Sequence, residues 1–266
     1  MNAPLPAPLP EPATHSRAPR SVIVTGAASG IGRAAALAFA AQGDRVLIAD
    51  LDVDGAEETA RKITDTGGVA LAAVGDLGEQ RVVDEVVARA VAEFGGIDVL
   101  VNNAGIMDRM SAAHETGDDE WERVLRVDLT APFLLTRAVL PHMLTAGGGC
   151  LVFTGSEAGL RGGAAGAAYT AAKHGITGLV KNLAVMYRKQ GIRTNMIAPG
   201  PTATGIGVDS RPDAHGPAVV KSLIGANIGR LGSAGEQAAA IVWLASTEAA
   251  FVNGAVLPVD DGWSAV

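Results

Sequence analysis

The chain has 266 residues, 48% of them hydrophobic, which suits one large globular domain that needs no metal or disulfide for stability. Its formal net charge of −7 argues against a nucleic-acid or anionic-membrane partner, and the single cysteine, Cys150, excludes an intrachain disulfide and favours a reducing, cytoplasmic setting. No apolar run reaches the ~18 residues of a membrane-spanning helix, and we find neither a signal peptide nor a metal-ligand spacing of Cys and His.

The elements follow one another in a regular order along the chain. Residues 1–20 alternate proline with other residues and are predicted to form a disordered tail. Short apolar runs predict strands at 21–25, 45–49, 69–74, 98–101, 150–154, 192–197 and 255–258. Helical spacing predicts helices at 31–42, 54–66, 79–94, 118–144, 167–190 and 234–246, with Pro132 as a candidate bend.

Strands that alternate with helices indicate right-handed βαβ units and a parallel sheet covered on both faces. We therefore predict an α/β fold with a doubly wound parallel sheet of about seven strands, formed by a single domain over residues 21–266. Residues 203–231 are rich in glycine and proline, and we expect them to form an irregular lid loop over a site.

A glycine-rich turn lies between the first strand and the first helix: Thr25-Gly26-Ala27-Ala28-Ser29-Gly30-Ile31-Gly32. Glycines at such a turn let the backbone approach a pyrophosphate, and the helix N-terminus offers free N–H donors. An ordinary strand-to-helix turn is the alternative for a glycine pattern alone. The strand–turn–helix context favours a Rossmann-type dinucleotide site that uses Gly26, Ser29, Gly30, Ile31 and Gly32.

Asp50 ends the second predicted strand, about 20 residues after the glycine turn, where a carboxylate bonds the ribose hydroxyls. A carboxylate there, next to Leu51, would repel the 2′-phosphate of NADP, so we predict NAD as the cofactor. The alternative is a solvated loop acid, since Asp52 and Asp54 follow closely.

Tyr169 and Lys173 lie one turn apart on a predicted helix, and Ser156 follows a strand. A phenol has a pKa of about 10 in water. An ammonium ~4 Å away is worth ~4 kcal/mol at an effective dielectric of ~20, which lowers the phenol pKa by ~3. The tyrosine would then titrate near 7, where general acid–base catalysis is efficient. Taken alone, the pair is also compatible with an ordinary half-buried helix face.

These motifs occur in an order that resembles the short-chain dehydrogenase/reductase family in its one-domain form. The resemblance covers residue 21 to the C-terminus and rests on the glycine turn, Asp76, Asn102-Asn103-Ala104-Gly105, Ser156, Tyr169 with Lys173, and Pro199-Gly200. It implies an oxidoreductase that moves a hydride between NAD(H) and a secondary alcohol or ketone. Tyr169 would be the acid–base, Ser156 would position the substrate oxygen, and Lys173 would hold the nicotinamide ribose.

The same resemblance implies further cofactor contacts. Asp76 and Leu77 would lie at the adenine, and Asn103, Ala104 and Gly105 beside the cofactor at the end of the fourth strand. The residues expected near the nicotinamide carboxamide are Pro199, Gly200, Thr202 and Thr204. The family is commonly tetrameric, so we expect a homotetramer paired through helices 118–144 and 167–190.

Asp128 departs from the family, which usually has an asparagine there that completes a proton relay. An ionised Asp128 at ~8 Å from Lys173 would oppose the effect of the lysine by ~2 kcal/mol. The other interpretation is that Asp128 keeps only a structural hydrogen bond. The replacement of the usual asparagine by Asp128 also leaves a second function open: the chain could be an NAD-binding regulatory or sensor protein with impaired catalysis.

Two further residues have weaker claims on the site. Glu157, next to Ser156, either faces the pocket or is a solvated loop acid, and His114 is either a substrate contact or a surface histidine. The sequence does not name the substrate, because residues 203–231 build most of the pocket in this family.

Overall fold

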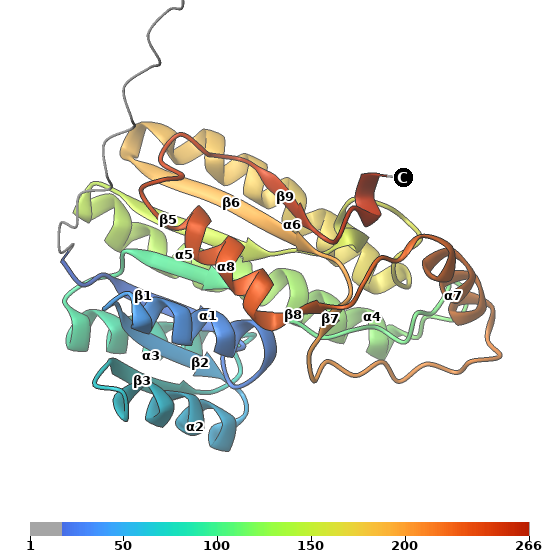
Figure 1. Cartoon of the computed structure of the whole chain (residues 1–266), viewed down its shortest axis with the longest axis horizontal. Coiled ribbons are helices and arrows are strands. Elements are labelled where there is room, and N and C mark those ends of the chain that lie inside the picture. Colours follow the sequence, from blue (N-terminus) through green and yellow to red (C-terminus); the bar gives the residue numbers. More distant parts are fainter. Residues whose placement is uncertain (1–17, 266) are drawn as a thin grey trace, which may run out of the picture.

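The computed structural model describes residues 18–265, and seven parallel strands form its central sheet in the order β3-β2-β1-β4-β5-β6-β9 (Figure 1). The strands are β1 (Ser21–Thr25), β2 (Arg45–Asp50), β3 (Val69–Val74), β4 (Val99–Asn102), β5 (Gly149–Thr154), β6 (Ile192–Pro199) and β9 (Val256–Val259). The predicted doubly wound sheet is confirmed. The strand order reverses between β1 and β4, which is where such sheets bind ligands at the carboxyl ends of their strands.

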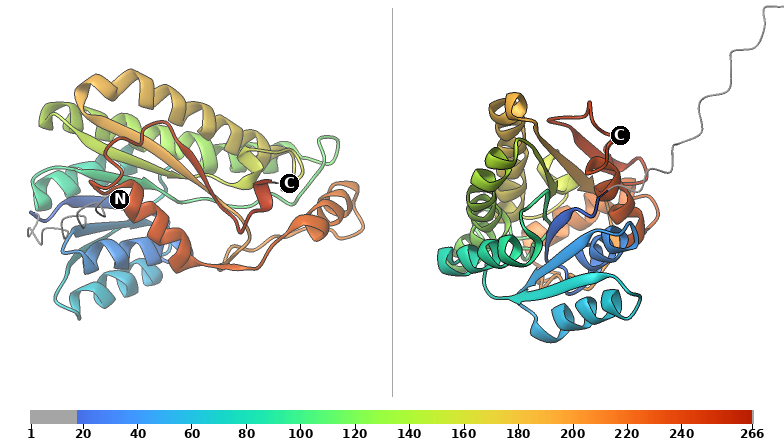
Figure 2. Two further views of the ribbon diagram at one scale, coloured as in Figure 1. Left: turned by 45° about the horizontal axis from the view of Figure 1, so that its top comes forward. Right: turned by 90° about the vertical axis from the view of Figure 1, so that its left-hand side faces the viewer.

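The helices are α1 (Gly30–Ala41), α2 (Val53–Thr64), α3 (Gln80–Phe94), α4 (Asp118–Leu125), α5 (Ala131–Ala146), α6 (Ala167–Tyr187), α7 (His215–Asn227) and α8 (Ala234–Leu244). Helices α1, α2 and α8 cover one face of the sheet, and α3, α5 and α6 cover the other (Figures 1 and 2). Within residues 18–265, none of the helices combines the length and the apolar character that crossing a membrane requires.

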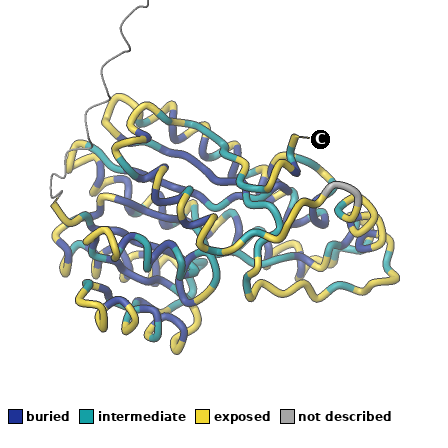
Figure 3. The backbone as a smooth tube through the Cα atoms, in the orientation of Figure 1, coloured by how far each residue is buried: buried dark blue, intermediate teal, exposed yellow. Residues whose placement is uncertain are grey.

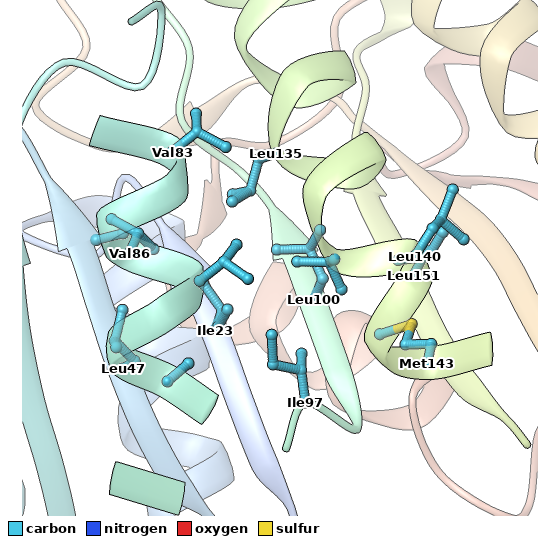
Figure 4. Packing of buried hydrophobic residues seen from close by; sticks show 14 of the residues in the cluster. Ile23, Leu47, Val83, Val86, Ile97, Leu100, Leu135, Leu140, Met143 and Leu151 are labelled. Carbon is cyan, nitrogen blue, oxygen red and sulfur yellow. The ribbon is translucent and has the colours of Figure 1, made fainter. Parts of the chain in front are cut away.

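Each strand sends alternate side chains into two separate cores. Ile23, Leu47 and Leu100 pack against α3 and α5, where Figure 4 shows them beside Val86 and Leu135. The neighbouring strand residues, such as Val22, Val46 and Val99, pack on the opposite face against α1 and α8. Because both faces of the central strands are buried, most of their residues are apolar, and the sheet is a platform for the loops at its edge.

The predicted disordered tail falls largely on residues 1–17, which lie outside the described residues. Arg20, at the end of the predicted tail, is held in place: its guanidinium lies 2.8 Å from the Asp44 carboxylate, and its backbone N–H donates to the same side chain at 3.0 Å. Arg20 is therefore part of the folded domain and not of a disordered tail.

The single helix expected over 118–144 is instead two helices joined by a π-helical turn, Arg126–Thr130. In this turn the N–H of Ala131 donates to the carbonyl of Arg126, five residues back. Pro132 has no N–H for the carbonyl four residues before it, so the regular helical bonding is interrupted there. The widened turn contains Asp128, and such turns are frequent at functional sites.

The 203–231 segment is not wholly irregular, because it contains helix α7. The segment leaves the body beside β7 (Thr202–Ala203) and returns at β8 (Gly232–Ser233), and these two short strands pair with each other. Figure 2 shows α7 reaching out beyond the end of the sheet, and Figure 3 shows that much of the segment is exposed. The glycines and prolines in the sequence hid the 13-residue helix.

Candidate active site

A cavity of about 990 Å³ opens at the carboxyl ends of the strands and reaches toward α7. Among the predicted site residues, the ones that line it are Gly26, Ser29, Gly30, Ile31, Asp50, Leu51, Asp76, Leu77, Asn103, Ala104, Gly105, Ser156, Tyr169, Lys173, Pro199, Gly200, Thr202 and Thr204. Two predicted residues, Gly32 and Asp128, do not line the cavity. The fold thus brings residues from six loops to one place.

Close packing explains the glycines of the turn. Gly26 has a left-handed backbone (φ 64°), and a Cβ there would lie 2.7 Å from the Cα of Ala104. Gly32 lies within α1, where a Cβ would come 2.1 Å from the carbonyl oxygen of Gly26. Gly32 therefore allows the first turn of α1 to pack against the carbonyl of Gly26. The cavity itself is lined by Gly26, Ser29, Gly30 and Ile31.

The two acids expected at the adenosine end differ in their bonding. Asp50 accepts hydrogen bonds from the backbone N–H groups of Ala28 at 2.8 Å and Asp52 at 3.0 Å, so it is fixed at the mouth of the glycine turn. Asp76 accepts from Gly78 N–H and forms an ion pair with Arg126 at 2.7 Å. Burial acts to raise the pKa of Asp76, but the bonds from Arg126 and Gly78 outweigh it and lower the pKa.

Asn103 joins three strand ends. Its side-chain amide donates to the carbonyl of Thr25 at 3.0 Å, and its side-chain oxygen accepts from the hydroxyl of Thr154 at 3.0 Å. The hydroxyl of Thr25 in turn accepts from the N–H groups of Asn103 and Ala104, both at 2.9 Å. These bonds lock β1, β4 and β5 together beneath the cavity.

At the end of β6, where the nicotinamide is expected, Thr202 donates its hydroxyl to the carbonyl of Gly200 at 3.0 Å and accepts from the amide of Gln237 at 3.2 Å. The side chain of Thr204 approaches the glycine turn, since a Cβ on Gly30 would meet it at 3.3 Å. The start of the 203–231 segment is therefore packed against the turn that is predicted to hold the pyrophosphate.

Ser156, Tyr169 and Lys173 meet inside the cavity. The Ser156 hydroxyl faces the Tyr169 phenol closely enough to act to lower its pKa, and the Lys173 ammonium lies 5.2 Å from the centre of the Tyr169 ring. Lys173 also donates to the carbonyl of Thr154 at 3.3 Å. Both Tyr169 and Lys173 are buried, so a proton exchanged here would pass between groups shielded from bulk water.

Asp128 lies against Lys173, with its carboxylate 3.0 Å from the ammonium. The separation of ~8 Å assumed from sequence is wrong, because the π-helical turn brings this carboxylate inward. Its second oxygen accepts from the N–H of Ile106 at 3.2 Å, and a Cβ on Gly105 would meet the first at 2.7 Å. Asp128 is thus a buried partner of the lysine placed behind the cavity wall.

The charges of this cluster move the pKa values in directions that the sequence did not anticipate. Burial raises the pKa of Tyr169, Lys173 acts in the opposite direction, and Asp128 adds to the rise, so the net shift is upward. The expected lowering of the Tyr169 pKa toward 7 is therefore wrong, because it omitted the cost of burying a phenolate. Burial favours a neutral Lys173, but contact with Tyr169 and Asp128 raises its pKa overall.

A comparison with known proteins identifies the family. The short chain dehydrogenase model matches residues 20–215. This chain belongs to the short-chain dehydrogenase/reductase family. The family explains why a glycine turn, a tyrosine–lysine pair and a serine meet on one sheet edge, and its members bind a nicotinamide cofactor.

Several similar dehydrogenases and reductases are known. A cis-4-hydroxycyclohexanecarboxylate dehydrogenase of Sinomonas cyclohexanicum is 42% identical over 255 residues, which cover 94% of this chain and 98% of the relative. The 3beta-hydroxysteroid dehydrogenase 2 of Eggerthella lenta is 40% identical over 249 residues, with coverages of 92% and 95%. The crystal structure of levodione reductase matches with a TM-score of 0.85 at 35% identity, covering 93% of this chain and 98% of that one.

Similar structures contain either form of the nicotinamide cofactor. A chain from Beutenbergia cavernae, with 38% identity, a TM-score of 0.82 and coverages of 93% and 97%, was solved with NADP at low occupancy. A 3-ketoacyl-(acyl-carrier-protein) reductase from Brucella melitensis, with 30% identity, a TM-score of 0.81 and coverages of 92% and 98%, was solved with NADH. The fold is therefore compatible with either cofactor, and the residues near the glycine turn of this dehydrogenase/reductase determine which one it prefers.

The end of the cavity nearest α7 contains residues that the sequence did not single out. Met107 and Met110 line it from the loop after β4, Ile224 and Ile228 from α7 and its end, and Trp263 from the C-terminal segment. Trp263 is only 7% exposed and packs in the cluster that contains Tyr169. Trp263 is far from the motifs along the chain, so no sequence pattern predicted that it would line the cavity.

Glu157 and His114 do not belong to the cavity lining. Glu157 is fully buried, and its carboxylate lies 3.1 Å from the Arg161 guanidinium. Both alternatives expected for Glu157 are therefore wrong, because its side chain neither faces the cavity nor lies in solvent. Burial and the nearby Asp260 carboxylate raise the pKa of Glu157 to about 7. His114 is an exposed residue whose ring centre lies 5.8 Å from that of His215, which agrees with the surface interpretation.

Glu115 anchors α7 to the loop after β4. Its carboxylate accepts from the N–H groups of His215 at 2.7 Å, Gly216 at 2.9 Å and Ala112 at 3.1 Å. The first two lie at the N-terminus of α7, where a carboxylate also meets the positive end of the helix dipole. The bond from Gly216, followed by that from Ala112, lowers the pKa of Glu115 to about 2.

We expect Glu115→Gln to loosen α7, because the glutamine amide turns a donor toward N–H groups that need an acceptor. Hydrogen exchange should become faster in residues 215–227 and the KM for substrate should rise. Since the folded-state pKa lies below the free value of 4.5, the anchor of the wild type should hold above pH 4.5 and be lost as the pH falls toward 2. The matched control is Glu122→Gln on the exposed face of α4, and equal exchange in both variants would contradict the anchor.

Proposed function

We propose that this member of the family is an NAD-dependent dehydrogenase of secondary alcohols and reductase of the corresponding ketones. The observation that carries the proposal is the meeting of Ser156, Tyr169 and Lys173 in a cavity that also contains the glycine turn. A tyrosine placed between a serine hydroxyl and an ammonium has both a hydrogen-bond partner and a charge that stabilises its ionised form.

The residues of the cavity fit a nicotinamide dinucleotide. Glycine at 26 lets the turn pack closely against Ala104, and the N-terminus of α1 has no side-chain cap of its own, so its N–H groups are free for a pyrophosphate. We infer that Gly26, Ser29, Gly30 and Ile31 hold this group, and that Gly32 shapes the turn. When bound there, a nicotinamide would supply the hydride acceptor for oxidation of the alcohol and the hydride donor for reduction of the ketone.

In the oxidation direction, the Tyr169 phenolate would accept the proton of the substrate hydroxyl. Ser156 would donate a hydrogen bond to the same oxygen and orient it, and Lys173 would stabilise the phenolate and hold the nicotinamide ribose. In the reduction direction the phenol of Tyr169 returns the proton to the carbonyl oxygen. The burial of Tyr169 and Lys173 limits exchange of the proton with bulk water.

NAD is the proposed cofactor because of Asp50. Its carboxylate is fixed by two backbone N–H groups beside the glycine turn, where a 2′-phosphate would meet it. Arg33, on α1, is committed to Glu58 at 3.0 Å and to the hydroxyl of Thr59 at 3.0 Å. It is therefore poorly placed to neutralise a phosphate.

The shape of the substrate end favours a bulky apolar or cyclic substrate. Its walls carry Met107, Met110, Ile224 and Trp263, and Ala164 leaves space near the reacting groups. Two similar proteins are named for cyclic substrates, a hydroxycyclohexanecarboxylate and a hydroxysteroid. We propose that residues 203–231 act as the lid of this end within the single catalytic domain 21–266.

We further propose a cytoplasmic homotetramer. Val185 and Met186 at the end of α6 are more than half exposed, and Phe133 and Leu144 on α5 are also exposed. Apolar side chains in this arrangement are typical of faces that pair with a second copy.

The test is a panel of cyclic and aromatic alcohols and ketones, assayed with NAD and NADP side by side. Tyr169→Phe should lower kcat by about 10²- to 10⁴-fold, the usual contribution of a general acid–base, while leaving NADH binding intact. Full turnover by this variant would refute the role of Tyr169. Tight NADH binding without turnover of any panel compound in the wild type would support the sensor alternative instead.

Asp50→Asn should shift the cofactor preference toward NADP, because it removes the charge and keeps an oxygen to accept from Ala28. We expect the ratio of kcat/KM for NADP to that for NAD to rise about tenfold or more, equivalent to ~1.4 kcal/mol or more. Asp52→Asn, at the start of α2, is the matched control. A wild type that already prefers NADP would overturn the argument from Asp50.

Asp128→Asn should move the onset of alcohol oxidation to lower pH by about one pH unit. This shift corresponds to ~1.4 kcal/mol less destabilisation of the Tyr169 phenolate. The carboxylate of Asp128 opposes ionisation of Tyr169, so its neutral analogue lets the phenolate form earlier. The measurement is the pH dependence of kcat/KM for the alcohol. Coincident profiles for the two proteins would mean that Asp128 serves only to hold the loop at Ile106.

A further inference from the structure

A buried carboxylate outside the known motifs contacts the helix that carries Tyr169. Asp108 lies in the loop after β4 and is 1% exposed. One oxygen accepts from the N–H groups of Met110 at 2.9 Å and Gly166 at 3.1 Å, and the other accepts from the N–H of Tyr169 at 3.0 Å. Two of its three donors thus lie at the start of α6, Gly166 just before the helix and Tyr169 in its first turn.

This first turn has no cap of its own. Gly166 is the residue before α6 and has no side chain to accept from the free N–H groups of the helix. No side chain fits there, because a Cβ would lie 2.6 Å from both the Asp108 carboxylate and the N–H of Ser111. Asp108 therefore supplies, from another loop, the acceptor that an N-cap residue usually supplies, and its negative charge meets the positive end of the helix dipole.

We propose that Asp108 is a positioning residue for Tyr169: it binds the backbone N–H of the tyrosine itself and so sets where the phenol stands relative to Ser156 and the substrate oxygen. This inference rests on the proposed role of Tyr169 as the acid–base. The contact is direct, since the carboxylate reaches the same residue whose hydroxyl is in the cavity.

The substrate loop and the reacting tyrosine are joined by the same bonds. The loop that carries Asp108 also contributes Ile106, Met107 and Met110 to the cavity lining. The backbone of Ser111 adds a further link, because its carbonyl accepts from the N–H of Ala167 at 2.9 Å. A displacement of this loop would therefore be passed to the first turn of α6 through Asp108.

The chain offers a matched control in Glu120. It is also 1% exposed, and its carboxylate accepts from the N–H of Arg109 at 2.6 Å and from the hydroxyl of Ser111 at 3.0 Å. Glu120 thus holds the same loop, but its bonds go to the loop and not to α6. Glu120→Gln perturbs the loop while leaving the acceptor for Tyr169 in place.

The experiment compares the full-length wild type, Asp108→Asn and Glu120→Gln. An asparagine at 108 has the shape of the aspartate but turns a donor toward one of the α6 N–H groups. For each protein we would measure kcat and KM for cyclohexanol, the Kd for NADH by fluorescence, and hydrogen exchange at the start of α6. Exchange and NADH binding do not require turnover, so they remain informative if the proposed reaction is wrong.

For Asp108→Asn we expect kcat to fall about 10- to 100-fold, the size that misplacement of a reacting group by an ångström produces, with KM and the NADH Kd changed by less than about threefold. Exchange at residues 167–170 should be faster than in Glu120→Gln, which should retain kcat within about threefold. A kcat within about twofold of the wild type in Asp108→Asn, or equal losses in both variants, would overturn the proposal. If Asp108→Asn does not fold, we would use Asp108→Ser, which keeps one acceptor oxygen. The same changes in kcat, KM, NADH Kd and exchange would then be expected.

Discussion

A buried ammonium has to be neutralised by its neighbours, and this requirement organises the candidate site. Lys173 is withdrawn from water, and its partners come from three places: Asp128 in the π-helical turn, the carbonyl of Thr154 at the end of β5, and the ring of Tyr169 one turn away. A buried cation without such partners would be strongly destabilising. The position of the lysine therefore depends on α5, β5 and α6 being correctly packed.

The same neutralisation has a consequence for catalysis. The ammonium favours an ionised Tyr169, while burial and the Asp128 carboxylate disfavour it, so the net pKa of the phenol is raised. An asparagine at 128 would satisfy the hydrogen bond to Ile106 without adding this charge. The aspartate thus couples the stability of the buried lysine to the ease with which the tyrosine gives up its proton.

Carboxylates that accept from backbone N–H groups are the recurring device of the loops around the cavity. Asp50 holds the glycine turn, Asp108 holds the start of α6, and Glu115 holds the start of α7. Each is bound to a helix N-terminus or to the turn before a helix, where an anion is favoured by the free N–H groups and the helix dipole. The rigid sheet supplies the platform, and these acids place the loops on it.

The sequence by itself determined the seven strands, most of the helices, and nearly every motif residue that lines the cavity around the glycine turn, because these depend on local periodicity and on glycines required by local backbone geometry. Only the tertiary structure decided the contact of Asp128 with Lys173, the burial of Glu157, and the positions of Asp108 and Trp263. Helix α7 was hidden by its glycine and proline content, and the π-helical turn by a continuous helical pattern across Pro132. Ionic and capping contacts join residues far apart in the chain, so their distances follow from packing and leave no periodic signal.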